Sequence, residues 1–328
     1  MIFNSSSIVA WQVIMLLVVT NEMEMKGMTA YRSVTTPTLE VGYLEWNPRG
    51  RRTAVLLHGW PDSPEGWAVV AEHLATAGYR VLCPALRGFG PTRFRAAHAM
   101  RSGQLAALGR DLLEFVAAMA LRRPVLIGHD WGARAVANAC GLAAGVASHM
   151  VMLSVGYGTN GPQQSISLIQ ARNYWYHWYM ATPRGGRTVE QDSQAFARMM
   201  WDTWSPDGWY QEKDFALAAL AFENPDWASV VLHSYRHRWG LAAGDAAYEE
   251  DEAQLNPAPR LAVPTLVLHG AADACNHPDS SAGKEGFLPA LTGASCWRVS
   301  GTSHTGKCPS RWPRPFLSSC RLEAQSQR

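Results

Sequence analysis

The segment "VLIGHDWGARAVANAC", residues 125–140, decides how we interpret the fold. Its apolar run at residues 125–127 predicts a buried strand, and the small residues after Gly132 predict a helix that packs close to a sheet. Gly128 and Gly132 flank Asp130, which is typical of a sharp strand-to-helix turn that presents a nucleophile at its tip. The tip residue is an aspartate where an ester-cleaving enzyme would have a serine. The segment therefore predicts an α/β fold with a carboxylate nucleophile.

A carboxylate at this position indicates a saturated target carbon. A serine alkoxide suits a carbonyl carbon, whereas a carboxylate can displace a leaving group from a strained ring or an alkyl halide. The product of that displacement is an ester of the protein's own Asp130. A histidine elsewhere would then have to activate a water molecule that hydrolyses the ester.

Short apolar runs and helical patterns alternate on both sides of this segment. Strands are predicted for apolar runs before and after it, and helices between them (strands 39–46, 53–59, 79–86, 149–155, 263–273 and 295–301; helices 66–77 and 104–121). Residues 159–257 lack such strand runs and are rich in Trp and Tyr, so we interpret them as a helical lid over a pocket. The sequence thus predicts a mostly parallel sheet formed by residues 28–158 and 258–304, with the lid inserted between them.

Composition excludes several classes of function. The 328 residues are 47% hydrophobic and 17% charged, which suits one large core. The net charge of +2 comes from residues 298–328, which hold six basic residues and one acid, and no basic stripe indicates nucleic-acid binding. The six cysteines show neither a CxxC pair nor metal-ligand spacing. We therefore expect free thiols, a cytoplasmic protein, and neither a metal nor a cofactor.

Both ends of the chain depart from the core pattern. Residues 8–19 are apolar except for Gln12, but this stretch is too short to span a bilayer, and no Lys or Arg precedes it. We therefore treat residues 1–27 as an extraneous or disordered extension without a stable membrane anchor. Residues 305–328 contain prolines at 309, 313 and 315 and no apolar stripe, so we expect an atypical, disordered tail.

Three motifs in order carry a family resemblance: "HGWP" at 58–61, "RGFGPT" at 87–92 and "GHDWGA" at 128–133. With the lid, an acid loop and a final histidine, the chain resembles α/β-hydrolase-fold epoxide hydrolases and, less specifically, haloalkane and haloacetate dehalogenases. The resemblance implies that Asp130 is the nucleophile, that Asp273 is the acid and that His304 activates water. Asp279 is an alternative to Asp273, and His269 and His277 are alternatives to His304.

The resemblance also assigns the oxyanion donors to the backbone N–H groups of Trp60 and Trp131. In epoxide hydrolases two lid tyrosines protonate the alkoxide. "YHWYMATPRG" and "HSYRHRWG" match their local patterns with Tyr176 and Tyr235, and Tyr174 and Tyr179 are alternatives to Tyr176 (segments 176–185 and 233–240).

The residue after the nucleophile bears on the dehalogenase alternatives. A haloacetate dehalogenase would have an arginine there, whereas this chain has Trp131, with Arg134 one turn on. Haloalkane dehalogenases carry tryptophans as halide donors, so Trp131 and Trp175, both expected to bind substrate, keep that class open.

We therefore predict a soluble hydrolase that opens a small apolar epoxide to a vicinal diol with water. A haloalkane or haloacid dehalogenase of the same fold is the alternative. A second alternative is a catalytically impaired homologue that binds small apolar ligands, because the tail lacks the closing helix of the relatives.

Overall fold

The structure is a computed structural model that describes residues 30–159, 164–205, 208–270, 273–284 and 286–288. His304, the strand predicted at 295–301, and the two terminal segments lie outside the described residues. Within them, no helix is long and apolar enough to cross a membrane.

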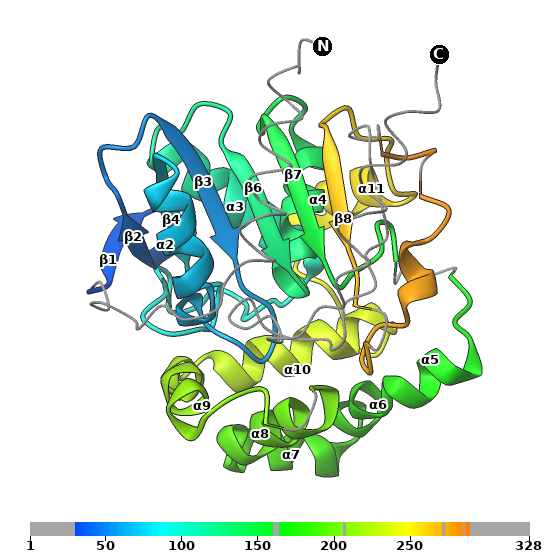
Figure 1. Cartoon of the computed structure of the whole chain (residues 1–328). Coiled ribbons are helices and arrows are strands. Elements are labelled where there is room, and N and C mark those ends of the chain that lie inside the picture. Colours follow the sequence, from blue (N-terminus) through cyan, green and yellow to red (C-terminus); the bar gives the residue numbers. More distant parts are fainter. Residues whose placement is uncertain (1–29, 160–163, 206–207, 271–272, 285, 289–328) are drawn as a thin grey trace, which may run out of the picture.

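A mixed sheet forms the centre of the described chain (Figure 1). Its strand order is β1-β2-β4-β3-β6-β7-β8, and the short β5 pairs with β2. Strands β4, β3, β6, β7 and β8 run parallel, whereas β1, β2 and β5 pair antiparallel at one side. The strands are β1 Arg32–Thr35, β2 Leu39–Trp46, β3 Arg52–Leu57, β4 Tyr79–Pro84, β5 Arg93–Phe94, β6 Val125–His129, β7 His149–Leu153 and β8 Thr265–Leu268.

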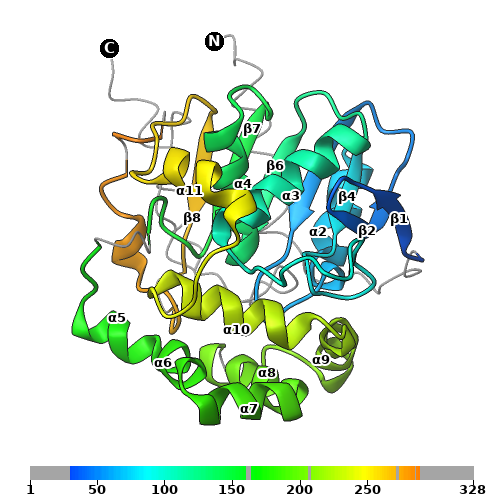
Figure 2. The ribbon, with the colours of Figure 1, turned by 180° about the vertical axis from the view of Figure 1, so that it is seen from behind.

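Helices cover both faces of the sheet. Helix α2 (Ala68–Thr76) lies on one face, and α3 (Leu105–Ala118), α4 (Trp131–Leu142) and α11 (Glu249–Leu255) lie on the other (Figure 2). The middle of the sheet is buried, which explains its apolar runs: β6 is buried at every residue, and β3 is buried from Ala54 onward. The predicted α/β-hydrolase fold is confirmed, with a mostly parallel sheet.

A layer of helices separates β7 from β8 in the chain and lies across the end of the sheet at which β6 leads into α4 (Figures 1 and 2). We call it the helical layer; it comprises α5 Leu168–Asn173, α6 Trp175–Ala181, α7 Pro183–Gln191, α8 Ser193–Trp204, α9 Glu212–Ala219 and α10 Trp227–Arg238. Helix α11 falls inside the predicted lid range but packs back on the sheet domain. Arg110 of α3 donates from Nε to Asp251 at 2.9 Å, and Gln254 donates to the Gly141 carbonyl oxygen at 3.0 Å.

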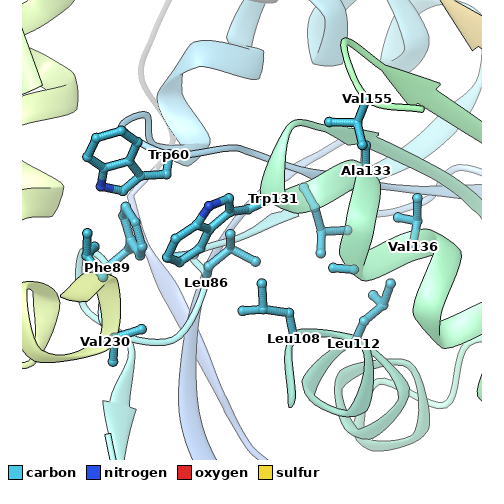
Figure 3. Close-up of a cluster of buried hydrophobic side chains, with 14 of the residues drawn as sticks. Trp60, Leu86, Phe89, Leu108, Leu112, Trp131, Ala133, Val136, Val155 and Val230 are labelled. Atoms are coloured by element: carbon cyan, nitrogen blue, oxygen red, sulfur yellow. The ribbon is translucent and has the colours of Figure 1, made fainter. Parts of the chain in front are cut away.

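One apolar cluster joins the sheet to the helical layer (Figure 3). Leu108 and Leu112 of α3 pack with Val136 of α4, and the same cluster continues to Trp60 and to Val230 of α10. Burying one such side chain contributes about 1.5–3 kcal/mol, so the shared cluster fixes the layer against the strand ends.

Candidate active site

Asp130 occupies a strained turn between β6 and α4. Its φ of +49° and ψ of −112° lie in a region that side chains rarely adopt. A Cβ at Gly132 would lie 2.1 Å from the Leu57 carbonyl oxygen, and one at Gly128 would lie 2.2 Å from the Gly132 oxygen. Only glycine therefore allows the start of α4 to pass this close to β3 and β6. This close packing presents the Asp130 side chain at the end of the sheet.

The Asp130 carboxylate is held from the neighbouring loop. The backbone N–H of Trp60 donates to Oδ1 at 2.9 Å, and a Cβ at Gly59 would lie 2.6 Å from the Asp130 Cβ. Asp130 is the N-cap residue of α4, but its side chain makes no capping hydrogen bond. Trp131 is the first residue of α4, so its N–H has no acceptor within the helix. The carboxylate thus lies beside the positive end of α4 and next to one preorganised donor.

His58 fixes the loop that supplies this donor. The ring lies 2.9 Å from the Gly59 oxygen through Nδ1, and its Nε2 accepts from the Leu86 N–H at 3.1 Å. A carbonyl only accepts, so the proton is on Nδ1. Burial lowers the pKa of His58 to about 4, and the ring is therefore neutral at pH 7. Its role is to position Trp60.

Tyr176 on α6 and Tyr235 on α10 meet above this loop. Both are buried, with ring centroids 5.4 Å apart at 80°. The Trp60 ring stacks on Tyr176 at 5.4 Å and meets Tyr235 edge-on at 5.2 Å. The Trp131 indole Nε1–H donates to the Tyr235 hydroxyl at 3.1 Å. Because Tyr235 accepts in that bond, its own hydroxyl proton remains available to another acceptor.

The two phenols are protonated at neutral pH. Burial raises the pKa of each well above its usual value; at Tyr235 the charge of Arg238 opposes this rise, and the negative charge of Asp130 adds to it at both residues. The Tyr176 hydroxyl lies 3.3 Å from the Cys275 sulfur. The pair therefore provides neutral O–H groups at the edge of the carboxylate site.

The alternative tyrosines use their hydroxyl groups elsewhere. Tyr174 donates to Asn276 Oδ1 at 2.7 Å, and the Tyr179 hydroxyl lies 2.9 Å from Thr188 Oγ1 on α7. Trp175 is half-buried and packs edge-on against Tyr176 at 6.3 Å. Trp175 therefore contacts the aromatic group through Tyr176, whereas Tyr176 and Tyr235 both contact Trp60 directly.

Asp273 follows β8 and is 6% exposed. Its Oδ1 accepts from the N–H groups of Cys275 at 2.8 Å and Asn276 at 2.6 Å, which fixes the turn. Its Oδ2 lies 3.3 Å from His269 Nε2, but that nitrogen also lies 2.9 Å from the Asn276 oxygen, which can only accept. Oδ2 has no hydrogen-bond partner of good geometry among the described residues. Burial raises the pKa of Asp273, and His269 acts against this rise.

The alternative acid and bases lie in different surroundings. The Asp279 side chain is 89% exposed and contacts His277 at 3.4 Å. His269 is buried, and its Nδ1 lies 2.7 Å from Ser281 Oγ. Both His269 ring nitrogens therefore have local partners.

Three residues of the site were missed or left unassigned from the sequence: His177, Arg134 and Arg238. His177 is buried, and its Nδ1 accepts from Trp239 Nε1 at 3.1 Å. Burial, then the positive charges of Arg238 and Arg134, lowers its pKa well below the usual value. Arg238 lies over the Tyr235 ring at 4.6 Å and over the Trp131 ring at 5.3 Å. The sequence signal for the two arginines is helical spacing. Arg238 lies three residues after Tyr235 and Arg134 four residues after Asp130, so each is expected near that residue.

Among the described residues, no group of three His, Cys, Asp or Glu side chains is placed to bind a metal ion. The cysteines in that part of the chain, Cys83, Cys140 and Cys275, are buried free thiols.

Comparison with known proteins fits this geometry. The family model for the alpha/beta hydrolase fold matches residues 54–306, most of the chain. The chain belongs to this family. A solved Klebsiella pneumoniae structure that is proposed to be an epoxide hydrolase shares 32% identity with a TM-score of 0.76, over 89% of this chain and 97% of that one.

Curated relatives point to the same branch of the α/β-hydrolase family. Epoxide hydrolase A of Mycobacterium tuberculosis is 30% identical over 160 residues, 48% of this chain and 49% of that protein. Epoxide hydrolase of Caballeronia sordidicola is 34% identical over 114 residues, 34% of each. The aligned regions thus span half or less of these two relatives. The chain is an epoxide hydrolase-like α/β hydrolase, as the motifs predicted.

Proposed function

We propose that this α/β hydrolase opens an epoxide to a vicinal diol through an ester on Asp130. The observation that carries the proposal is the meeting of a strained, N–H-bound carboxylate with two buried phenols from the helical layer, which we propose acts as a lid. We retain a cytoplasmic location as part of the proposal because the described cysteines are free thiols.

In the first step, an Asp130 oxygen attacks a ring carbon and the C–O bond of the ring breaks. The electron pair stays on the ring oxygen, which takes a proton from Tyr176 or Tyr235. Tyr235 fits this role because Trp131 donates to its oxygen and leaves its proton free. The product of this step is a hydroxyalkyl ester of Asp130.

In the second step, water adds to the ester carbonyl carbon of Asp130. The Trp60 N–H stabilises the oxyanion, since it already binds Oδ1 at 2.9 Å, and the N–H of Trp131 is the second donor. We assign activation of the water to His304, which follows the acid in the chain, and orientation of His304 to Asp273. Collapse of the intermediate breaks the ester C–O bond, and the alkyl oxygen takes the proton that His304 removed from the water and leaves as the second hydroxyl of the diol. The remaining proton of the water restores the phenol that acted in the first step.

One contact favours the epoxide over the halide substrate. A departing halide needs free N–H donors and no acid, yet the Trp131 indole N–H is bonded to Tyr235. In this arrangement the indole supports a proton donor.

The test is a single turnover of styrene oxide in ¹⁸O water, followed by mass spectrometry of the Asp130 peptide and of the diol. We expect ¹⁸O in the peptide and none in the first-turnover diol, because water attacks the carboxyl carbon. Asp130→Asn is expected to abolish diol formation, whereas Asp279→Asn, an exposed carboxylate control, keeps it. First-turnover ¹⁸O in the diol would contradict the ester mechanism. A wild-type chain that binds styrene oxide without turnover would support the ligand-binding alternative.

A further inference from the structure

Two arginines at the site lack any acidic partner. Arg134 is 6% exposed and Arg238 is half-buried, and neither has a carboxylate oxygen within 4.0 Å in the described part of the chain. The Nε atoms of both are buried and have no hydrogen-bond partner there. Buried guanidinium groups are normally paired, because an uncompensated charge in a low-dielectric site costs several kcal/mol. We therefore expect the two side chains to bind an anion.

Each arginine is held next to the reacting groups. Arg134 lies one turn into α4, and its N–H donates to the Asp130 carbonyl oxygen at 3.1 Å. Its Nη1 donates to the carbonyl and hydroxyl oxygens of Thr159, both at 3.0 Å. Arg238 lies at the end of α10, where its Nη2 donates to Ser234 Oγ at 3.1 Å.

Arg238 approaches the site through its aromatic neighbours. Its guanidinium lies over Trp131, which follows the nucleophile, and over Tyr235, one of the two phenols. Stacking on these rings orients a guanidinium while leaving its edge N–H groups free for a carboxylate.

The two charges also act on each other. Burial lowers the pKa of Arg238 and Tyr235 opposes this; the charge of Arg134 lowers the pKa further, and Asp130 raises it. Both arginines likewise lower the pKa of Tyr174 against the effect of burial. One Asp130 carboxylate thus balances only one of two cations in this group of side chains.

We propose that Arg134 and Arg238 hold a carboxylate of the substrate, so that this enzyme acts on epoxides with a carboxylate on or near the ring. The proposal rests on the function proposed above and names its substrate class. The arginines also solve an electrostatic problem, because an anionic nucleophile would otherwise be repelled by an anionic substrate. The aromatic group around Trp60 fits an aryl substituent on the other ring carbon.

The first experiment compares trans-3-phenylglycidate with its carboxamide as substrates of the full-length protein. We expect kcat/KM for the glycidate to fall about tenfold or more in Arg238→Gln and in Arg134→Gln, as expected for loss of one charge-assisted hydrogen bond, with the amide changed less than about threefold. Arg187→Gln removes an exposed charge from α7 and is expected to keep the wild-type ratio. Equal losses on both substrates, or none, would overturn the proposal.

A binding experiment separates this proposal from the proposed reaction. Calorimetric titration with 3-phenylpropanoate and with 3-phenylpropanamide needs no catalysis. We expect about tenfold tighter binding of the carboxylate, lost in either arginine variant and kept in Arg187→Gln. If the carboxylate preference appears without diol formation from either epoxide, the anion site stands and the hydrolase proposal fails. If both epoxides are hydrolysed equally and both probes bind alike, the hydrolase proposal stands and the anion site is refuted.

Discussion

Replacing Arg87 with Met tests how a buried ion pair supports the loops of the site. Arg87 is 1% exposed, and its Nε and Nη2 donate to the two Asp111 carboxylate oxygens, each at 2.6 Å. It also donates to the Ser102 carbonyl at 2.9 Å and to the Tyr248 hydroxyl at 2.9 Å. The substitution leaves the Asp111 carboxylate, whose side chain is only 11% exposed, without its partner. We expect the free energy of unfolding to fall by about 3–5 kcal/mol, the cost of an unpaired buried charge.

The double variant Arg87→Met/Asp111→Leu distinguishes an unpaired charge from lost packing. Two apolar side chains need no compensation, so we expect its free energy of unfolding to return to within about 1–2 kcal/mol of the wild type. Urea unfolding followed by circular dichroism at pH 7 measures all variants. A double variant as unstable as the two single variants added together would refute the reasoning.

The pH dependence of the single variant gives a second readout. Burial raises the pKa of Asp111, and Arg87 opposes that rise. Without Arg87 the folded state is expected to hold a proton on Asp111 that the unfolded state releases above a pKa of about 4. Stability from this group is then greatest below that value and falls as pH rises, so the deficit of Arg87→Met shrinks between pH 7 and about pH 4.

Three further changes test the site. Gly132→Ala places a Cβ 2.1 Å from the Leu57 oxygen, so we expect about 1–3 kcal/mol of destabilisation and loss of hydrolysis; a thermal midpoint equal to the wild type would contradict this packing. His58 has a folded pKa of about 4, below its unfolded value of about 6.5, so its contribution is complete above pH 6.5 and is lost as pH falls toward 4. The wild-type advantage over His58→Gln is expected to shrink by about 3 kcal/mol across that window, and a constant difference would disprove the assignment. Tyr235→Phe removes the acceptor of Trp131 and is expected to lower kcat about 100-fold while costing about 1 kcal/mol of stability; wild-type kcat in a stopped-flow assay would exclude Tyr235 as the acid.

The fold was predictable because its signals are local. Glycines on both sides of Asp130 reflect backbone contacts that exclude a Cβ, and the apolar run before them reflects a strand covered on both faces. Both signals can be recognised within residues 125–140, although the contacts that cause them involve β3. The boundary of the inserted helices was harder, because α11 has the same helical pattern as the layer but packs on α3 and α4.

The roles within the aromatic segments depend on tertiary contacts. Tyr174, Tyr176 and Tyr179 lie within six residues, and only the structure separates them by the partners of their hydroxyl groups. The net charge of the site could not be predicted from the sequence either. Arg134 and Arg238 are more than 100 residues apart, and their ion-pair partners depend on how these segments pack. Sequence spacing could place Arg134 near Asp130 and Arg238 near Tyr235, but it could not show that neither arginine has a carboxylate partner among the described residues.

The insertion point of the helical layer has a consequence for how such an enzyme can change. The carboxylate and its N–H donor belong to the sheet, whereas both phenols belong to a segment that leaves the sheet after β7 and returns before β8. In the proposed mechanism, forming and hydrolysing the ester depends on the two segments that flank the insertion, because one carries Asp130 and the other carries Asp273 and His304. Protonation of the leaving oxygen depends on the inserted segment itself. Recombination that exchanged only the inserted segment would retain the residues of the ester chemistry and replace those that protonate the leaving oxygen. A family that shares one nucleophile can in this way acquire new leaving groups without rebuilding its catalytic centre.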